Sequence, residues 1–197
     1  MCIRDRYGSS PYAASKAAAE MLVQAYARTY GLNTVTLRCT NNFGPHQFPE
    51  KFVPKTIISS ILGKHVPIYG NGMQIRDWIF VIDFCRAIDL AIEKASGGVV
   101  YNVSAGSEFP NLEVAKLILG ALGKPLDRLR FVEDRPGHDF RYSLDSTKIR
   151  EQLGWKPDHS FPDALRETVK WYLENEWWWK PLIDERILSE RPWKEEW

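Results

Sequence analysis

The 197-residue sequence has little cysteine and no long hydrophobic run. Cys2, Cys39 and Cys85 are widely spaced and form no CxxC pair or Cys/His cluster, so we predict neither a disulfide framework nor a metal site. Apolar stretches such as 78–82 are far shorter than the roughly 20 residues that cross a bilayer, and the N-terminus lacks the apolar core of a signal peptide. We therefore expect a cytoplasmic protein with no membrane partner.

Neither sign of charge predominates in the sequence. The 26 basic residues nearly balance the 25 acidic ones, which leaves a formal net charge of +1. Such a balance gives no long-range attraction to nucleic acid, so we expect no nucleic-acid partner. Any site for an anion must then be built from individual residues.

Helix-like and strand-like segments alternate along the chain, with short connections between them. The clearest helix runs from Ser15 to Tyr30, with Pro11 near its start and Gly31 as its stop. Further helices are predicted over 52–62, 82–95, 111–122, 146–153 and 162–174, and strands over 34–39, 66–69, 77–81, 99–103 and 129–132. This alternation predicts an α/β fold with much parallel sheet.

Two local features refine this prediction. Residues 41–45 follow the 34–39 strand and are rich in turn-forming types, so we expect a loop at the carboxyl edge of the sheet, where open α/β sheets bind ligands. Asn111 precedes a helical pattern and is predicted to be its N-cap.

Tyr12 and Lys16 are four residues apart, which places a phenol and an ammonium group on one face of a helix. A cation near a phenol favours its ionised form, which a tyrosine needs in order to exchange a proton with a sugar hydroxyl. The spacing alone would occur by chance at about even odds in such a sequence. An exposed Tyr/Lys pair without function remains the alternative.

Longer motifs give this pair a context. Residues 9–16, SSPYAASK, resemble the catalytic YxxxK segment of extended short-chain dehydrogenases. Residues 38–51, RCTNNFGPHQFPEK, resemble the RCxNNYGPxQxPEK stretch of the dTDP-glucose 4,6-dehydratase family, and RDW at 76–78 and EDRPGHD at 133–139 match two further family segments in order. The likeness runs from Ser9 to the C-terminus.

The resemblance implies a fold, a cofactor and a reaction. The fold would be the C-terminal part of a Rossmann-type doubly wound parallel sheet, with a smaller α/β substrate-binding region. The cofactor would be NAD and the substrate a nucleotide-diphosphate sugar, dTDP-glucose. Hydride would pass from the sugar C4 to NAD, water would be lost across C5 and C6, and the hydride would return to C6. The resemblance also implies a homodimer, paired through the 15–30 helix.

The sequence departs from the family at its N-terminus. It contains no GxGxxG and lacks the Thr-Asp-Glu segment that supplies the acid and base of dehydration. Both belong upstream of Tyr12, so we expect an N-terminally truncated chain. We assign residues 1–8 to a foreign or disordered leader, 9–45 to a remnant of the dinucleotide-binding domain, and 46–176 to the substrate-binding region. Residues 177–197 form an appendage expected to pack on a surface or a partner subunit.

The resemblance also assigns roles to individual residues. Tyr12 would be the catalytic base and Lys16 would tune it and hold the cofactor, with Asn42 beside the nicotinamide. Arg76 and Arg135 would clamp the diphosphate, because a guanidinium matches phosphate oxygens in a bidentate way. The remaining substrate-binding candidates are Asn41, Lys51, Phe52, Pro67, Ile68, Tyr69, Asn102, Asp134, Pro136, Gly137 and His138.

Several of these residues also have a purely structural explanation. Asn41 and Asn42 can simply stabilise a turn, and an aromatic residue in a strand, such as Tyr69, is more often part of a core. Two other functions also remain open at this point. One is a related UDP-sugar epimerase or decarboxylase that shares Tyr12 and Lys16, and the other is a non-catalytic nucleotide-sugar-binding remnant.

Overall fold

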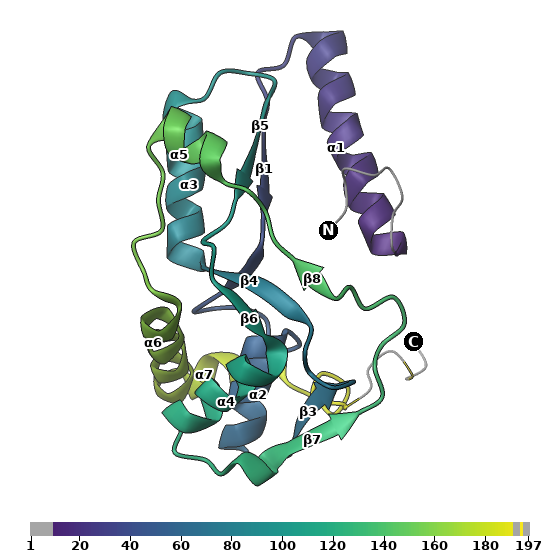
Figure 1. The fold of residues 1–197 in the computed structure, drawn as a ribbon, viewed down its shortest axis with the longest axis vertical. Helices are drawn as coiled ribbons and strands as arrows, with labels where there is room; N and C mark the ends of the chain where they lie inside the picture. The colour runs from purple at the N-terminus through teal and green to yellow at the C-terminus, as the bar shows by residue number, and fades with distance from the viewer. Residues whose placement is uncertain (1–9, 191–193, 195–197) are drawn as a thin grey trace.

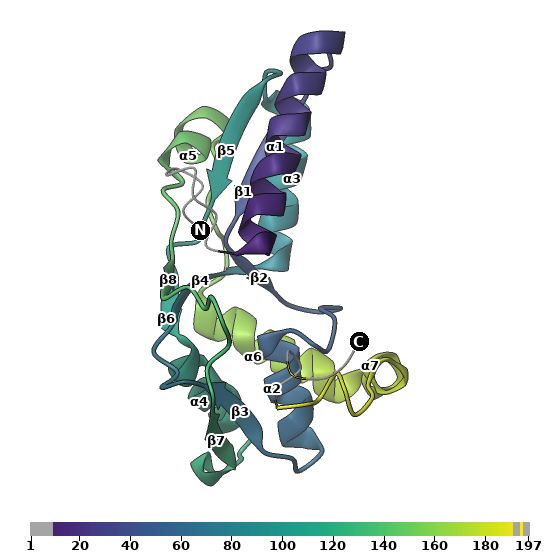
Figure 2. The same ribbon diagram turned by 90° about the vertical axis from the view of Figure 1, so that its right-hand side faces the viewer.

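The structure of the protein is a computed structural model, which describes residues 10–190 and 194. The expected leader, residues 1–8, lies outside the described residues. Helices and strands alternate along the described chain, as predicted for an α/β fold. Figures 1 and 2 show an elongated molecule with a strand pair and its helices at one end and a group of helices at the other.

The first layer is a parallel strand pair between helices. β1 (Val35–Cys39) pairs in parallel with β5 (Val99–Val103). One face of the pair packs against α3 (Val81–Lys94) and α5 (Thr147–Leu153), whose apolar side chains form a core around Trp155 and Tyr101. α1 (Pro11–Tyr30) lies on the opposite side of the pair (Figure 1). This helix–strand–helix order is the Rossmann-type layering that the sequence predicts.

α1 has well-formed ends but little packing. The Ser10 side chain accepts a hydrogen bond from the Ala13 N–H at 3.2 Å, and Gly31 ends the helix at φ 66°. No residue of α1 is buried, and a groove runs between its C-terminal half and β1 and β5. The Arg38 guanidinium, paired with the Glu20 carboxylate, ties the helix to β1. The helix begins at Pro11, near which its start is predicted, and the helical pattern read from Ser15 continues to Tyr30.

A mixed sheet crosses the middle of the molecule. β4 (Ile75–Phe80) pairs in parallel with β2 (Asn41–Phe43) and β8 (Arg141–Tyr142), and antiparallel with β6 (Glu108–Pro110). The prediction of a loop over 41–45 is therefore wrong for its first three residues. β6 and β8 were not predicted at all, because segments so short carry no alternating pattern and form by pairing with β4.

The second core lies beneath this sheet. α2 (Phe52–Ile61), α4 (Asn111–Ala121) and α6 (Phe161–Glu174) pack around an aromatic cluster. The buried aromatic residues of this cluster are Phe43, Trp78, Phe80, Phe161, Tyr172 and Trp179. β3 (Val66–Tyr69) and β7 (Leu129–Val132) form a parallel pair at its edge, after the 3-10 turn Leu126–Arg128.

One prediction about local structure is wrong. Asn111 is the first helical residue of α4 and not its N-cap, a position that Pro110 occupies. The Asn111 N–H instead donates to the Gln74 carbonyl at 3.0 Å. The segment 177–197, for which packing on a surface is expected, does pack at its start, because Trp179 of α7 (Glu176–Trp179) is fully buried and its Nε1–H donates to the Tyr172 carbonyl at 2.8 Å. Trp177, by contrast, is 70% exposed.

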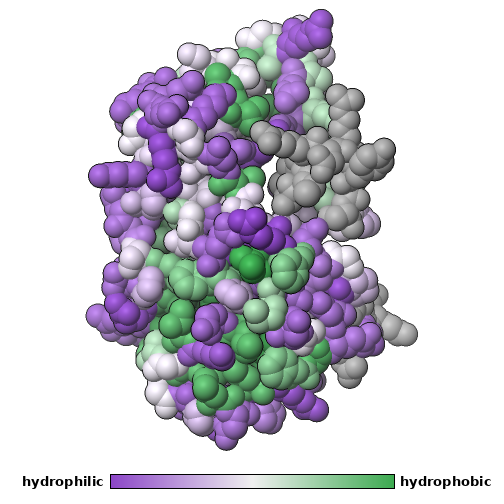
Figure 3. Space-filling view, viewed as in Figure 1, coloured by the Kyte–Doolittle hydropathy of each residue, from purple (hydrophilic) through white to green (hydrophobic). Residues whose placement is uncertain are grey.

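The surface of the described residues shows where apolar groups gather. In Figure 3 hydrophobic residues cover much of the lower half of the visible face, around α4, whereas the upper half is largely hydrophilic. Leu117 of α4 and Leu126 of the 3-10 turn after it are among the exposed apolar residues. Among the described helices, none has the length and hydropathy that a membrane span requires.

Candidate active site

The first group of predicted site residues lies at the carboxyl end of β1. The Asn42 Nδ2 donates to the Cys39 Sγ at 3.2 Å and to the Thr40 carbonyl at 3.4 Å. Burial raises the pKa of the Cys39 thiol, while the Asn42 hydrogen bond and the Lys16 charge oppose that rise. Lys16 therefore lies within electrostatic reach of Cys39. Lys16 and Asn42 thus both act on the Cys39 thiol, Asn42 through a hydrogen bond and Lys16 through its charge.

Two buried oxygens at this place have no hydrogen-bond partner among the described residues. They are the Asn42 Oδ1 and the Thr40 Oγ1. A buried acceptor without a partner costs about 1–3 kcal/mol, which binding of a donor removes. The carboxamide of a nicotinamide carries such N–H donors. The residues present therefore fit NAD, and Thr40 joins the candidate set although sequence reasoning did not identify it.

Tyr12 is open to a ligand. Tyr12 is 67% exposed, and its phenol makes no hydrogen bond to the described residues, whereas its backbone carbonyl accepts one from the Ser15 hydroxyl at 2.8 Å. Tyr12 and Lys16 both lie in the first turns of α1, at the end of the helix nearer β8 (Figure 1).

The second group lies between the end of β3 and residues 133–142. The Asp134 carboxylate accepts hydrogen bonds from the Gln74 Nε2 at 2.8 Å and the Arg135 N–H at 2.9 Å, and it faces the His138 Nδ1 at 2.6 Å. Burial pulls the pKa of Asp134 upward, but the His138 contact, the Arg135 N–H and the Gln74 amide hold it below its usual value. Asp134 is thus an ionised anchor for this segment.

His138 is held in one orientation by this anchor. Burial lowers the pKa of His138 more than its contact with Asp134 raises it, so the imidazole is neutral at pH 7. With Asp134 ionised, the Nδ1 carries the proton and the Nε2 is left as the other ring nitrogen for a ligand. The Tyr69 ring meets the imidazole edge to face, with centroids 6.5 Å apart.

Arg135 completes this group as an exposed cation. Burial raises the pKa of the Tyr69 phenol, and the positive charge of Arg135 opposes that rise. Arg135 also contributes to lowering the pKa of His138 and of Arg76, after the larger effect of burial on each. Its guanidinium makes no hydrogen bond or ion pair to the part of the chain that the structure describes. It is therefore available to an anion.

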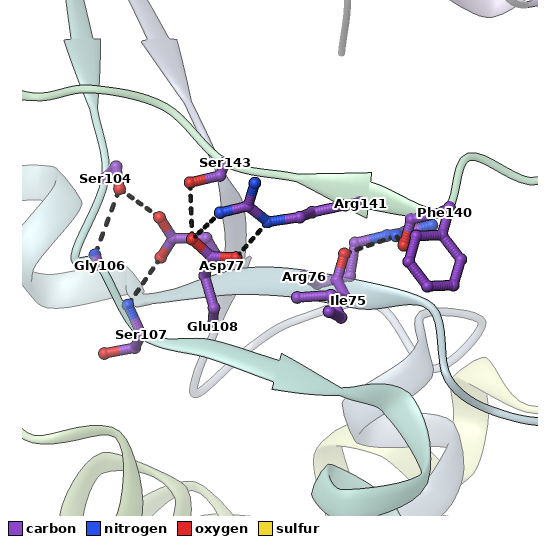
Figure 4. Close-up of polar contacts among 10 residues, drawn as sticks. All are labelled: Ile75, Arg76, Asp77, Ser104, Gly106, Ser107, Glu108, Phe140, Arg141 and Ser143. Carbon is purple, nitrogen blue, oxygen red and sulfur yellow. Dashed lines mark hydrogen bonds and ion pairs between the residues drawn. The ribbon is translucent and has the colours of Figure 1, made fainter.

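Arg76 is placed differently from Arg135. Its side chain is only 4% exposed, and the Nη1 donates to the Ile75 carbonyl at 2.7 Å and to the Phe140 carbonyl at 3.4 Å. The Nη2 donates to the Asp139 carbonyl at 2.8 Å. A guanidinium has five N–H donors, so these bonds leave part of the group for a ligand. Figure 4 shows Arg76 beside Phe140, at the start of β8.

Neighbouring carboxylates hold the surrounding loops. The buried Asp77 accepts hydrogen bonds from the Ser104 hydroxyl and from the Ser107 N–H, the latter at 3.1 Å (Figure 4). Burial raises the pKa of Asp77, and these hydrogen bonds oppose the rise. The Arg141 guanidinium donates two hydrogen bonds to the Glu108 carboxylate, with N–O distances of 2.6 and 2.8 Å. Both contacts fasten the segments on either side of β4.

The other predicted substrate residues are less favourably placed. Ile68 is 1% exposed in the core with Val66, and Pro67 is also buried. Phe52 packs against Trp78 with ring centroids 6.0 Å apart, and the exposed Lys51 pairs with Glu50.

Four other predicted residues are located by the strands or segments that contain them. Asn41 begins β2 opposite Trp78 of β4 and lies between Thr40 and Asn42, the candidate residues for holding the cofactor. Asn102 lies on β5, paired in register with Arg38, in a different sheet from Tyr69 of β3. Pro136 and Gly137 connect Arg135 to His138 in an exposed turn. The structure therefore does not bring Asn102 to Tyr69 and His138.

Two further residues of the site escaped sequence reasoning. Gln74 is buried, and its Oε1 has no partner among the described residues, while its Nε2 holds Asp134. Gln74 stands two residues before Arg76 in an extended segment, which places both side chains on the same face. That spacing could have indicated Gln74 as a site residue. Tyr142 lies under the Arg76 guanidinium, and no local signal in the sequence indicated this. The described residues contain no His, Cys, Asp and Glu cluster that could hold a metal.

Comparison with known proteins identifies the class. The model of the GDP-mannose 4,6 dehydratase family matches residues 4–168, most of the chain. The chain belongs to this family of nucleotide-sugar dehydratases, whose solved relatives share its Rossmann-type α/β fold.

Individual relatives are more specific. The chain is 51% identical over 174 residues to a dTDP-glucose 4,6-dehydratase from Streptomyces niveus, covering 88% of this chain and 52% of that one. It is 46% identical to the enzyme of the same name from Neisseria meningitidis, covering 93% and 55%. A dTDP-glucose 4,6-dehydratase from Streptomyces venezuelae, solved with NAD and TYD bound, superposes with a TM-score of 0.87 at 44% identity, covering 89% and 54%. The chain thus spans about half the length of the relatives it matches.

Proposed function

We propose that this chain carries the tyrosine–lysine pair and the nucleotide-sugar subsite of an NAD-dependent dTDP-glucose 4,6-dehydratase. The observation that carries the proposal is the gathering of Tyr69, His138 and two arginines, Arg76 and Arg135, around Asp134. An aromatic face beside two guanidinium groups suits a pyrimidine base followed by phosphates. The relatives of this name support the assignment of the base as thymine.

The chemistry of the proposed site divides between two groups of residues. Tyr12 in its phenolate form takes the proton from the C4 hydroxyl of the sugar and becomes a neutral phenol, and the nearby Lys16 ammonium stabilises the negative charge of the phenolate before this transfer. Bound NAD would supply the hydride acceptor. Asn42 and Thr40 offer buried acceptor oxygens that would orient its carboxamide. Arg76 and Arg135 hold the diphosphate, which fixes the sugar relative to Tyr12.

The binding part of this proposal can be tested on the chain itself. Isothermal titration of the 197-residue protein with dTDP, UDP and GDP should show saturable binding with dTDP preferred. A ratio of about tenfold over UDP would match a difference near 1.4 kcal/mol in binding free energy. Tight binding of GDP in place of dTDP, or no binding of any diphosphate, would contradict the proposed substrate. Circular dichroism of the same sample shows whether the chain is folded.

A UDP-sugar enzyme remains the second candidate function. A UDP-glucose 4-epimerase from Thermotoga maritima, solved with UDP-glucose, is 32% identical with a TM-score of 0.80 and covers 85% of this chain. The same titration decides between the two, because a preference for UDP would favour this alternative. The higher identity of the dTDP-glucose dehydratases, 43–51%, favours the first.

We also propose that the chain forms a homodimer through α1 in the cytoplasm. Beyond its first turns, the apolar residues that α1 exposes are Met21, Leu22, Val23, Tyr26 and Tyr30. An interface built on one copy of this helix against another would cover them in a two-fold arrangement.

Light scattering at micromolar concentration should therefore give twice the 22.8 kDa chain mass. Met21→Glu, which places a charge in the centre of the helix face, should return the protein to a monomer, whereas Glu93→Lys on α3 should not. A parent protein that scatters only as a monomer would contradict the dimer.

A further inference from the structure

Tyr142 makes two contacts that converge on one arginine. Its ring lies beneath the Arg76 guanidinium, with the Arg76 Cζ 4.3 Å from the ring centroid. Its hydroxyl donates to the carboxylate of Asp139. The backbone carbonyl of the same Asp139 accepts the Arg76 Nη2 at 2.8 Å. The Tyr142 ring, the Asp139 carboxylate and the Asp139 carbonyl thus form one connected set of contacts around the Arg76 guanidinium.

This set accounts for the orientation of Arg76. The carbonyls of Ile75, Phe140 and Asp139 take hydrogen bonds from the two terminal nitrogens, and the Tyr142 ring covers one face of the plane. A guanidinium stacked on an aromatic face gains about 0.5–2 kcal/mol, depending on how far it is desolvated. The remaining N–H donors are therefore held in a fixed direction and need no rearrangement before a ligand binds.

Tyr142 itself is well suited to this position. Burial raises the pKa of its phenol to about 12, and the nearby Asp139 carboxylate adds to the rise. The hydroxyl therefore stays a neutral donor to Asp139 throughout the physiological range. β8 fixes the backbone, because Tyr142 pairs in register with Arg76 of β4. The two side chains come from directly opposed positions on neighbouring strands.

We propose that Tyr142 is a positioning residue for the diphosphate subsite, which orients the Arg76 guanidinium toward the phosphates through its ring and through Asp139. This inference rests on the proposed function, because it takes Arg76 as part of the diphosphate site. Tyr142 does not touch the ligand in this proposal. Its effect should therefore fall on the phosphate part of the ligand and not on the base.

The test compares two ligands that differ only in the diphosphate. Isothermal titration of the 197-residue chain with dTDP and with thymidine should show that Tyr142→Leu weakens dTDP binding about tenfold, since ring stacking and one hydrogen bond are lost. Thymidine binding should stay within about twofold. Tyr142→Phe keeps the ring and removes only the hydroxyl contact with Asp139, so it should weaken dTDP binding only about threefold. Tyr30→Leu on the exposed end of α1 serves as the control and should change neither ligand.

A second measurement follows Arg76 without any ligand. Phenylglyoxal reacts with exposed guanidinium groups, and peptide mass spectrometry gives the rate at each arginine. Tyr142→Leu should raise the rate at the buried Arg76 at least fivefold, while the exposed Arg166 keeps its rate, and Tyr30→Leu should leave both unchanged. Equal rates at Arg76 in the parent and Tyr142→Leu proteins would overturn the positioning role.

The two arms separate failure of this inference from failure of the proposed function. If the parent chain binds dTDP but Tyr142→Leu weakens dTDP and thymidine equally, Tyr142 is only structural and the inference is overturned. If the folded parent chain binds neither ligand, the proposed function fails, and with it the claim that Arg76 serves a diphosphate. The labelling rates then still decide whether Tyr142 holds Arg76.

Discussion

Tyr12→Phe should reduce the rate of NAD reduction by dTDP-glucose by about 10²–10⁴-fold, the range typical of a positioned general base. The measurement needs a cofactor-binding half, which a chimera supplies when the N-terminal half of the Streptomyces niveus relative is placed before Ser10 of this chain. The phenol of Tyr12 is exposed and its side chain makes no hydrogen bond within the described residues. Loss of the hydroxyl should therefore leave folding and dTDP binding intact.

Single-turnover absorbance of bound NADH gives this rate directly. Tyr26→Phe is the matched control, because Tyr26 lies on the same helix and is also exposed, and it should keep the parental rate. Lys16→Met should also lower the rate, with weaker retention of NAD. A Tyr12→Phe protein that forms NADH as fast as the parent would reject Tyr12 as the base.

The alternation of apolar and turn residues was enough to predict the long elements. The strands 66–69, 99–103 and 129–132 were predicted with the bounds that the structure shows, and Gly31 ends α1 as expected. These segments carry their own signal, because side chains of one strand face or one helix face are apolar over their whole length. Elements that depend on a partner strand carry no such signal. β8 exists because Arg141 and Tyr142 pair with Ile75 and Arg76.

The same difference between local and long-range signals separates the site residues that the sequence indicates from those that it does not. The exposed or chemically distinctive residues, such as Tyr12, Arg135 and His138, were found through motifs. Residues that act by holding another residue were missed, because their roles arise from contacts between distant parts of the chain. Gln74 reaches Asp134 across 60 positions, and Tyr142 reaches Arg76 only after β8 has formed. The motifs also did not indicate which side chains are buried, since Ile68 lies in a matched motif segment but belongs to the core.

Replacing the two arginines of the proposed diphosphate site should give two different results. Arg76→Lys should weaken dTDP binding by at least tenfold and also lower the Tm. The buried guanidinium donates to three backbone carbonyls of segments 75 and 139–140, and a lysine cannot serve these and a phosphate together. Each charge-assisted hydrogen bond lost is worth about 1.5–3 kcal/mol.

Arg135→Lys should weaken dTDP binding about tenfold at an unchanged Tm. Its guanidinium is exposed and serves no described protein group, so only bidentate contact with a phosphate would be lost. Arg166→Lys provides the control, because Arg166 is an exposed residue of α6 paired with Asp163, far along the chain from both segments. Titration with dTDP and a thermal melt of each variant separate binding from stability. Unchanged dTDP affinity in both Arg76→Lys and Arg135→Lys would remove these arginines from the binding site, whereas a lowered Tm for Arg76→Lys alone would leave it as a structural tie between β4 and the 139–140 segment.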